Sequence, residues 1–166
     1  MYVFAFKTQQ RVLICGFNGK FIRCNPDQLD EVDEHGDSSS LAVWNVSFDK
    51  SDKKVIRLEN AKTKKYLRAV NGGLDCRGTG GMDCSFKFVK GKSGLIALES
   101  VVAPDQWIFV FPQGIATGKR SEFAHLSVWG EKEHVKNIVK ATPLKQQNAQ
   151  QQQSYNAIFC EQCRCV

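Results

Sequence analysis

The feature of this sequence that most limits its fold is a threefold recurrence of hydrophobic landmarks. Three kinds of landmark each occur three times within the first 135 residues. Landmarks of the first kind open a strand: Val12, Val55 and Leu95. Landmarks of the second kind open the strand after it: Phe21, Tyr66 and Trp107. Landmarks of the third kind begin a hydrophobic-x-hydrophobic strand: Trp44, Phe86 and Leu126. Successive members lie 43 and 40, 45 and 41, and 42 and 40 residues apart. A nearly constant period indicates a repeat architecture, here three units of about 42 residues.

The segments between the turns are short and have the composition of β-strands. RVLICG (11–16), LAVWNVSF (41–48) and QWIFVF (106–111) are rich in β-branched and aromatic residues, and turn residues separate such segments. No 3.6-residue periodicity interrupts the series. One unit alone cannot bury its apolar face, but three can close around a pseudo-threefold axis and leave no open sheet edge. The sequence therefore predicts an all-β chain with the β-trefoil fold.

A glycine-rich stretch precedes the strand that holds Phe86 and Phe88. It reads NGGLDCRGTGGM (71–82), and we interpret it as a wide turn that links two strands of the second unit. The matching stretch of the first unit, NPDQLDEVDEHGDSSS (25–40), is acidic and is also expected to be a long loop. The glycines do not indicate a phosphate site, because the chain has no GxxxxGK(S/T) motif and no helix pattern follows GTGG.

The composition changes near residue 136. Residues 1–135 hold the strand pattern and form the predicted β-trefoil domain, whereas residues 136–166 are polar and include the run KQQNAQQQQS. A glutamine tract buries too little apolar surface to offset its ordering entropy, so we predict a mostly disordered Gln-rich tail. Three cysteines lie near the end of this tail: Cys160, Cys163 and Cys165. The sequence does not decide whether they are free thiols, are lipidated, bind a metal or form intermolecular disulfides.

The cysteine count and the apolar segments bear on the cellular compartment but leave it open. Seven cysteines, an odd number lying mostly within apolar alternation, favour free core thiols over a complete disulfide framework. No segment approaches the roughly 20 apolar residues of a membrane-spanning helix, so we expect no transmembrane segment. The first residues, MYVFAFKTQQRVLIC, lack a basic n-region and an uninterrupted apolar stretch, so we expect no conventional signal peptide.

The chain is mildly basic, with a formal net charge of +6 at pH 7. This charge favours an anionic partner such as a sulfated glycan, a nucleic acid or a membrane surface, although the same charge also serves solubility alone. The basic residues fall in four clusters: Lys50, Lys53 and Lys54; Lys62, Lys64, Lys65 and Arg68; Lys87, Lys90 and Lys92; and Lys119 and Arg120. Two clusters on one face would hold a polyanion, with an affinity that falls as salt is added.

No set of residues has the spacing of a catalytic or metal site. His35, His125 and His134 fall in no HExxH or related frame, and no GxSxG elbow is present. The acidic run DEVDEHGD (30–37) lacks the EF-hand spacing for calcium, and we interpret it as a solvated loop. We therefore expect no enzyme activity, no cofactor and no metal site.

Two short motifs surround the glycine-rich stretch. The first is Gly72-x-Leu74-x-Cys76, and the second, after six residues, is Asp83-Cys84-x-Phe86. Together they resemble the pattern of the fibroblast growth factor family, including its characteristic core cysteine. Further segments (13–23, 54–70 and 106–120) are similar to the first hairpin, the second unit and the glycan-binding segment of that family. The resemblance covers about residues 10–130 and implies the β-trefoil fold.

The resemblance also implies partners and site residues. Asn18, Lys119 and Arg120 would contact the sulfate groups of heparan sulfate, which offer fixed charge and several acceptor atoms. Phe88 and Leu95 lie in the family's receptor-contact region, but the family has Glu and Tyr there. The implied protein partner is the ectodomain of a receptor tyrosine kinase, and we expect no nucleic-acid partner. The implied location is extracellular without a conventional signal peptide, with cytoplasm or nucleus as the alternative.

A second class of protein fits two hairpins of the sequence. NGKFIRC (18–24) and TKKYLRA (63–69) are similar to the hairpin that fascin-type actin bundlers repeat. The alternative interpretation is therefore an intracellular trefoil scaffold that binds actin or another protein. A lectin fits less well, because the QxW motif that such trefoils often repeat is represented only by Gln106-Trp107, at a different spacing.

Overall fold

The computed structural model describes residues 10–16, 18–36, 38–90, 95–111, 114–119 and 124–130. All of these belong to the first of two compact units, Met1–His134. The predicted Gln-rich tail, residues 136–166 with its three cysteines, lies outside the described residues.

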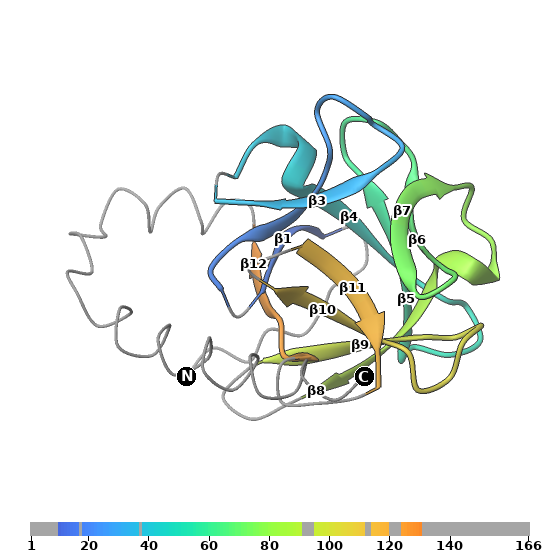
Figure 1. Ribbon diagram of the computed structural model, residues 1–166. Coiled ribbons are helices and arrows are strands. Elements are labelled where there is room, and N and C mark those ends of the chain that lie inside the picture. Colours follow the sequence, from blue (N-terminus) through green and yellow to red (C-terminus); the bar gives the residue numbers. More distant parts are fainter. Residues whose placement is uncertain are drawn as a thin grey trace, which may run out of the picture. The chain divides into compact units, whose positions relative to one another are not determined.

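The described part of the chain contains twelve strands and two single-turn 3-10 helices, joined by turns and loops, and the strands pair antiparallel throughout (Figure 1). The strands are β1 (Arg11–Cys15), β2 (Phe21–Cys24), β3 (Val32–His35), β4 (Val43–Phe48), β5 (Val55–Asn60), β6 (Tyr66–Val70), β7 (Gly73–Gly78), β8 (Ser85–Lys90), β9 (Ile96–Ser100), β10 (Trp107–Phe111), β11 (Gly114–Gly118) and β12 (Ser127–Gly130). The helices are Ser40–Ala42 and Met82–Cys84. The predicted all-β class is confirmed.

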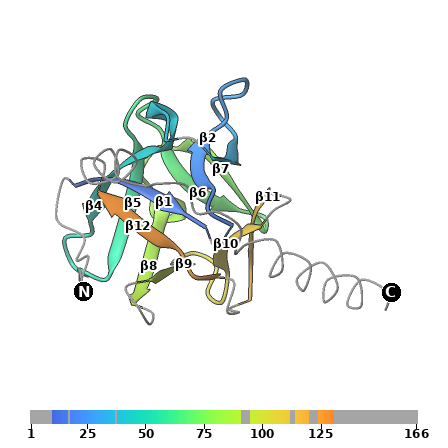
Figure 2. The same ribbon diagram turned by 90° about the vertical axis from the view of Figure 1, so that its left-hand side faces the viewer.

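Six of the strands form a closed ring. Antiparallel ladders join β1 to β4, β4 to β5, β5 to β8 and β8 to β9, and β12 pairs with β1 (Figure 2). The ring closes between β9 and the residue before β12. There Ile96 and Leu126 exchange both backbone hydrogen bonds, at 2.8 and 2.7 Å. Closure leaves no free edge on these six strands, which removes a template for aggregation.

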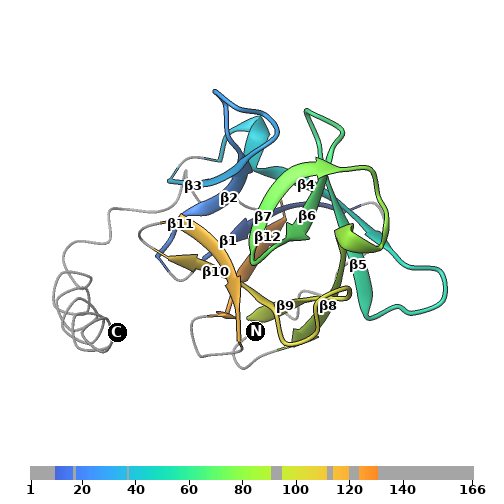
Figure 3. The same ribbon diagram turned by 45° about the vertical axis from the view of Figure 1, so that its right-hand side comes forward.

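The other six strands form three hairpins that contact one another. The hairpins are β2–β3, β6–β7 and β10–β11, and their second strands β3, β7 and β11 meet (Figure 3). Backbone bonds join them: the Thr117 N–H donates to the Gly72 carbonyl at 3.1 Å, and the Cys76 N–H donates to the Asp30 carbonyl at 2.8 Å. Each hairpin begins at one of the predicted aromatic landmarks: Phe21, Tyr66 and Trp107.

The core takes equivalent residues from each third of the chain. Strands β1, β5 and β9 contribute the fully buried Ile14, Leu58 and Leu98. Strands β2, β6 and β10 contribute the fully buried Ile22, Leu67 and Ile108. The third set of landmarks is also fully buried: Trp44, Phe86 and Leu126. The Trp44 indole N–H donates to the Ile22 carbonyl at 2.9 Å, which fixes the largest core side chain. Each such burial stabilises the fold by about 1.5–3 kcal/mol before entropic costs.

Two segments predicted as loops contain strands. Asn71 and Gly72 have φ of 50° and 79°, and Val70 pairs with Gly73, so these two residues form a tight turn. The glycine-rich stretch therefore contains β7, and the acidic stretch contains β3, because both pair with the preceding strand. A third and smaller difference concerns Leu95, which the sequence predicts to open a strand. Strand β9 begins at the next residue, Ile96.

Candidate anion-binding surface

Strand pairing brings two of the basic clusters together. The exposed lysines of the β4–β5 turn and of β8 form what we call the lysine surface: Lys50, Lys53, Lys54, Lys87 and Lys90. Lys87 lies opposite Val55 in the β5–β8 ladder, and the Phe88 N–H donates to the Lys54 carbonyl at 2.9 Å. The turn that carries the first cluster therefore lies beside β8, which carries Lys87 and Lys90 of the third cluster, while Lys92 lies outside the described residues.

A hydrogen-bonded turn fixes the lysines of the β4–β5 connection. The Asp49 carboxylate accepts from the Ser51 hydroxyl at 2.6 Å, from the Ser51 N–H at 2.9 Å and from Arg57 at 3.0 Å. These donors hold the pKa of Asp49 well below its usual range. The Asp52 carboxylate accepts from the Lys54 N–H at 2.8 Å. Both carboxylates thus accept hydrogen bonds within the turn, while the lysines on either side remain exposed.

The second basic cluster, in contrast, is largely paired with carboxylates. Arg68 binds Asp75 across β6–β7 through two hydrogen bonds, of 3.0 and 2.6 Å. Burial raises the pKa of Asp75, but the bonds from Arg68 and from a backbone N–H outweigh it, and the net shift is downward. Lys65 forms an ion pair with Asp30, which lowers the pKa of that carboxyl. Only part of this cluster's positive charge is therefore uncompensated.

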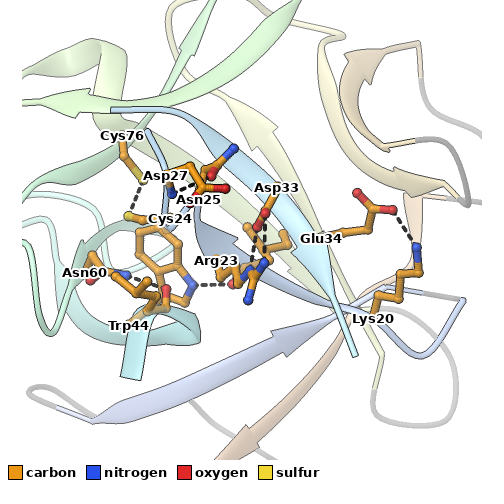
Figure 4. A network of polar contacts seen from close by, with 12 residues as sticks. Lys20, Arg23, Cys24, Asn25, Asp27, Asp33, Glu34, Trp44, Asn60 and Cys76 are labelled. Carbon is orange, nitrogen blue, oxygen red and sulfur yellow. Dashed lines mark hydrogen bonds and ion pairs between the residues drawn. The ribbon is translucent and has the colours of Figure 1, made fainter. Parts of the chain in front are cut away.

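The first hairpin shows the same kind of pairing. Arg23 binds Asp33 through bonds of 2.7 and 3.0 Å, and Lys20 binds Glu34 at 2.8 Å (Figure 4). The Arg23–Asp33 pair lies between β2 and β3, and Lys20, the residue before β2, binds Glu34 of β3. These basic residues serve the hairpin, which leaves the lysine surface as the stronger anion-binding candidate.

The structure places the residues implied by the resemblance on different elements. Asn18 is half-buried in the β1–β2 turn, where its side-chain oxygen accepts from the Lys20 N–H at 3.0 Å. Lys119 is exposed and directly follows β11, and Arg120 lies outside the described residues.

The β10–β11 hairpin relates these two positions. The turn that holds Asn18 approaches β10 closely, since a side chain at Gly16 would clash with Val110. Val110 pairs with Ile115 in β11. Lys119 is four residues further along the chain, about 13 Å if extended. Asn18 and Lys119 are thus related only through this hairpin, whereas the five lysines of the lysine surface lie on one turn and the adjacent strand.

Phe88 and Leu95, the residues of the implied receptor-contact region, are both half-buried. The Phe88 ring meets the Phe48 ring edge to face, with centroids 6.3 Å apart and planes at 72°, and it packs against the main core. Such a pair contributes about 0.5–1.5 kcal/mol beyond its buried area. Much of the Phe88 side chain therefore serves packing at the rim of the core.

The described residues contain no group of three or more His, Cys, Asp or Glu side chains that could hold a metal ion. Two of the histidines can be placed: His35 is exposed on β3, and His125 is half-buried before β12. The third, His134, is among the residues that are not described. In the same ranges no helix is long and apolar enough to cross a membrane.

Comparison with known proteins gives a fold likeness alone. No protein-family model and no curated protein matches this chain. A solved structure described as "Structure and mode of action of a mosquitocidal holotoxin" is similar, with a TM-score of 0.66 and 10% sequence identity over 75% of this chain. The match covers 18% of that protein's chain. The similarity therefore extends to one part of a much longer protein.

Proposed function

We propose that this chain is a β-trefoil signalling ligand of the fibroblast growth factor type. It binds heparan sulfate and the ectodomain of a receptor tyrosine kinase outside the cell, and it catalyses no reaction. The closed ring of six strands, the three contacting hairpins and the period of about 42 residues support the β-trefoil fold. The motifs around Cys76 and Cys84 support the family.

The lysine surface supports the glycan-binding part of the proposal. Five exposed ammonium groups lie on one turn and the adjacent strand, while the carboxylates of that turn are engaged in internal hydrogen bonds. Sulfated glycans are extended polyanions, so closely spaced cations bind them more tightly than scattered ones. The binding is electrostatic and weakens as the ionic strength rises.

Salt elution from immobilised heparin tests the glycan proposal. The Lys54→Glu/Lys87→Glu variant removes two members of the lysine surface, whereas Lys62→Glu/Lys64→Glu makes the same charge change in the β5–β6 turn. We expect the first variant to elute at clearly lower salt than the wild type, and the control to shift much less. Equal shifts would show that only net charge matters, and wild-type elution at very low salt would contradict glycan binding.

The residues implied by the resemblance need a separate variant. If Asn18 and Lys119 contribute to the same glycan site, Asn18→Ala/Lys119→Ala lowers the elution salt of the wild type. If the lysine surface alone binds, the shift is within the error of the control. Receptor binding is tested with purified receptor tyrosine kinase ectodomains and soluble heparin, and no saturable binding to any of them would overturn that part of the proposal.

One observation favours the intracellular scaffold as a second candidate. The two hairpins that resemble those of fascin-type proteins begin with β2 and β6, and each carries an Arg–Asp pair at the same position: Arg23–Asp33 and Arg68–Asp75. Cosedimentation with actin filaments tests this candidate. Antibody staining of intact and permeabilised cells separates the extracellular location from cytoplasm or nucleus, because only a surface-bound ligand stains intact cells.

A further inference from the structure

Two cysteines from different hairpins meet in the core. Cys24 of β2 and Cys76 of β7 are both fully buried, and their sulfur atoms are 2.6 Å apart (Figure 4). Both cysteines are free thiols in the structure, and the separation is longer than a covalent disulfide of about 2.05 Å but well inside the van der Waals contact of two sulfurs. We propose that Cys24 and Cys76 form a disulfide that cross-links the first and second hairpins, with a low-molecular-weight disulfide such as oxidised glutathione as the oxidant.

The backbone around the two cysteines already holds the hairpins in register. The Cys76 N–H donates to the Asp30 carbonyl at 2.8 Å, and Glu31 and Asp75 form an isolated antiparallel bridge. The ion pair between Lys65 and Asp30 joins the same two hairpins. The two sulfurs are therefore brought together by contacts that do not depend on a bond between them, so closing the disulfide requires little rearrangement.

The other two described cysteines have different surroundings. Cys15 donates to the Gly16 carbonyl at 3.4 Å, and Cys84 donates to the Asp83 carboxylate at 3.4 Å. Both are buried, and burial raises the pKa of each thiol. Shared metal binding by Cys24 and Cys76 is disfavoured, because the described residues provide no third ligand and two thiolates on one metal lie further apart.

The oxidation balances as two exchange steps. The thiolate of one cysteine attacks oxidised glutathione, forms a mixed disulfide and releases one glutathione thiolate. The thiolate of the other cysteine then attacks the protein sulfur of that mixed disulfide and releases the second glutathione thiolate. Two protons leave the protein thiols, two electrons pass to glutathione, and one S–S bond forms in the protein. Because neither sulfur is exposed, the first step takes place during folding or after local opening.

The contact between the two thiols shifts their pKa values in opposite directions in the folded protein. The contact with the Cys76 thiol lowers the pKa of Cys24, with smaller contributions from Thr63 and Lys65. The same contact, together with burial, raises the pKa of Cys76. Because this contact is lost when local opening exposes the thiols, either cysteine can make the first attack on the oxidant.

Peptide mapping of the full-length chain tests the cross-link directly. The protein is equilibrated in buffers rich in oxidised or reduced glutathione, quenched in acid, alkylated and digested with trypsin without reduction. The four described cysteines fall in four different tryptic peptides: 12–20, 24–50, 69–77 and 78–87. We expect peptides 24–50 and 69–77 to be recovered as one linked species, two hydrogen masses lighter than their sum, and the other two peptides to be alkylated.

Thermal stability gives a second readout. A cross-link between residues 24 and 76 restricts the unfolded chain, so the oxidised protein should melt roughly 10 °C higher than the protein in dithiothreitol. The difference should disappear in Cys24→Ser and Cys76→Ser and persist in Cys15→Ser. Full alkylation of Cys24 and Cys76 after oxidation, or an equal redox effect in all variants, would overturn the proposal. Neither readout depends on glycan or receptor binding, so the proposed function is tested separately.

Discussion

Asn60 is a fully buried polar residue whose side chain satisfies three backbone groups. Its amide nitrogen donates to the Leu41 carbonyl at 2.7 Å, and its side-chain oxygen accepts from the N–H groups of Lys62 and Thr63, both at 3.1 Å. It therefore shapes the β5–β6 turn and ties it to the segment before β4. The Asn60 side chain therefore determines the geometry of the β5–β6 turn, whereas the composition of that turn shows only that it is polar.

We expect Asn60→Ala to lower the free energy of unfolding by about 3 kcal/mol, because it leaves the buried Leu41 carbonyl without its donor and removes two part-buried hydrogen bonds of the turn. Urea denaturation followed by circular dichroism measures the change. Asn45→Ala is the control: Asn45 is half-buried and donates to Glu59 at 3.2 Å, so its loss should change stability by less than about 1 kcal/mol. Equal effects of the two substitutions would contradict the assignment.

Asp49 makes stability depend on pH in the acid range. Its pKa in the folded protein is below that of an unfolded chain, about 3.9, so the folded state binds fewer protons there. The stabilisation is complete above about pH 4 and is lost as the pH falls through the folded pKa. In Asp49→Asn the melting temperature should fall less between pH 5 and pH 2 than in the wild type. Asp27→Asn, at an exposed position, is the control, and identical wild-type and Asp49→Asn profiles would contradict the prediction.

At the scale of elements, the hairpins repeat a pattern of cross-strand pairs. The β2–β3 and β6–β7 hairpins each hold an Arg–Asp pair in register, and the β10–β11 hairpin has Phe109 opposite Ala116 instead. A double-mutant cycle on Arg68→Ala and Asp75→Ala should give a coupling energy of about 1 kcal/mol that decreases in high salt. A coupling near zero in low salt would show that the pair does not stabilise the hairpin.

How far the sequence predicts these elements depends on what each strand packs against. Core-facing strands have strong apolar landmarks, and Phe21, Tyr66 and Trp107 correctly mark where three strands begin. β3 reads VDEH, and none of its residues is fully buried although Val32 packs against the main core, so the strand has little hydrophobic pattern. The Asn71–Gly72 pair is a recognised hairpin signal, but the neighbouring glycines obscured it.

Close packing explains why one of those residues, Gly78, is a glycine. Such contacts between distant parts of the chain cannot be predicted from the sequence. A side chain at Gly78 would clash with the Cys84 sulfur and with Tyr66, so the residue belongs to a tightly packed strand and not to a loose turn. The lysine surface and the contact between Cys24 and Cys76 arise in the same way, from pairing and packing between residues more than thirty positions apart. The basic clusters and the buried thiols are visible in the sequence, but their neighbours are not.

At the scale of the whole unit, one shared core implies one cooperative transition. The main core cluster includes residues from all six strands of the ring, and Leu126 is a fully buried member at the closure. Leu126→Ala should cost about 2–5 kcal/mol, and its unfolding curves from tryptophan fluorescence and far-ultraviolet circular dichroism should still coincide. Val102→Ala, at an exposed position, should change stability by less than about 0.5 kcal/mol. Separate curves for the two probes would contradict a single core.

The pairing of β1 with β12 has a practical consequence. Val12 lies opposite Gly130, so the first strand of the described part of the chain begins beside the point where its last strand ends. A domain with this property can be inserted into a surface turn of a host protein without displacing the host segments on either side of the turn. For the same reason, joining the end of β12 to the start of β1 by a short peptide and opening the chain at another turn should yield a protein with the same arrangement of strands.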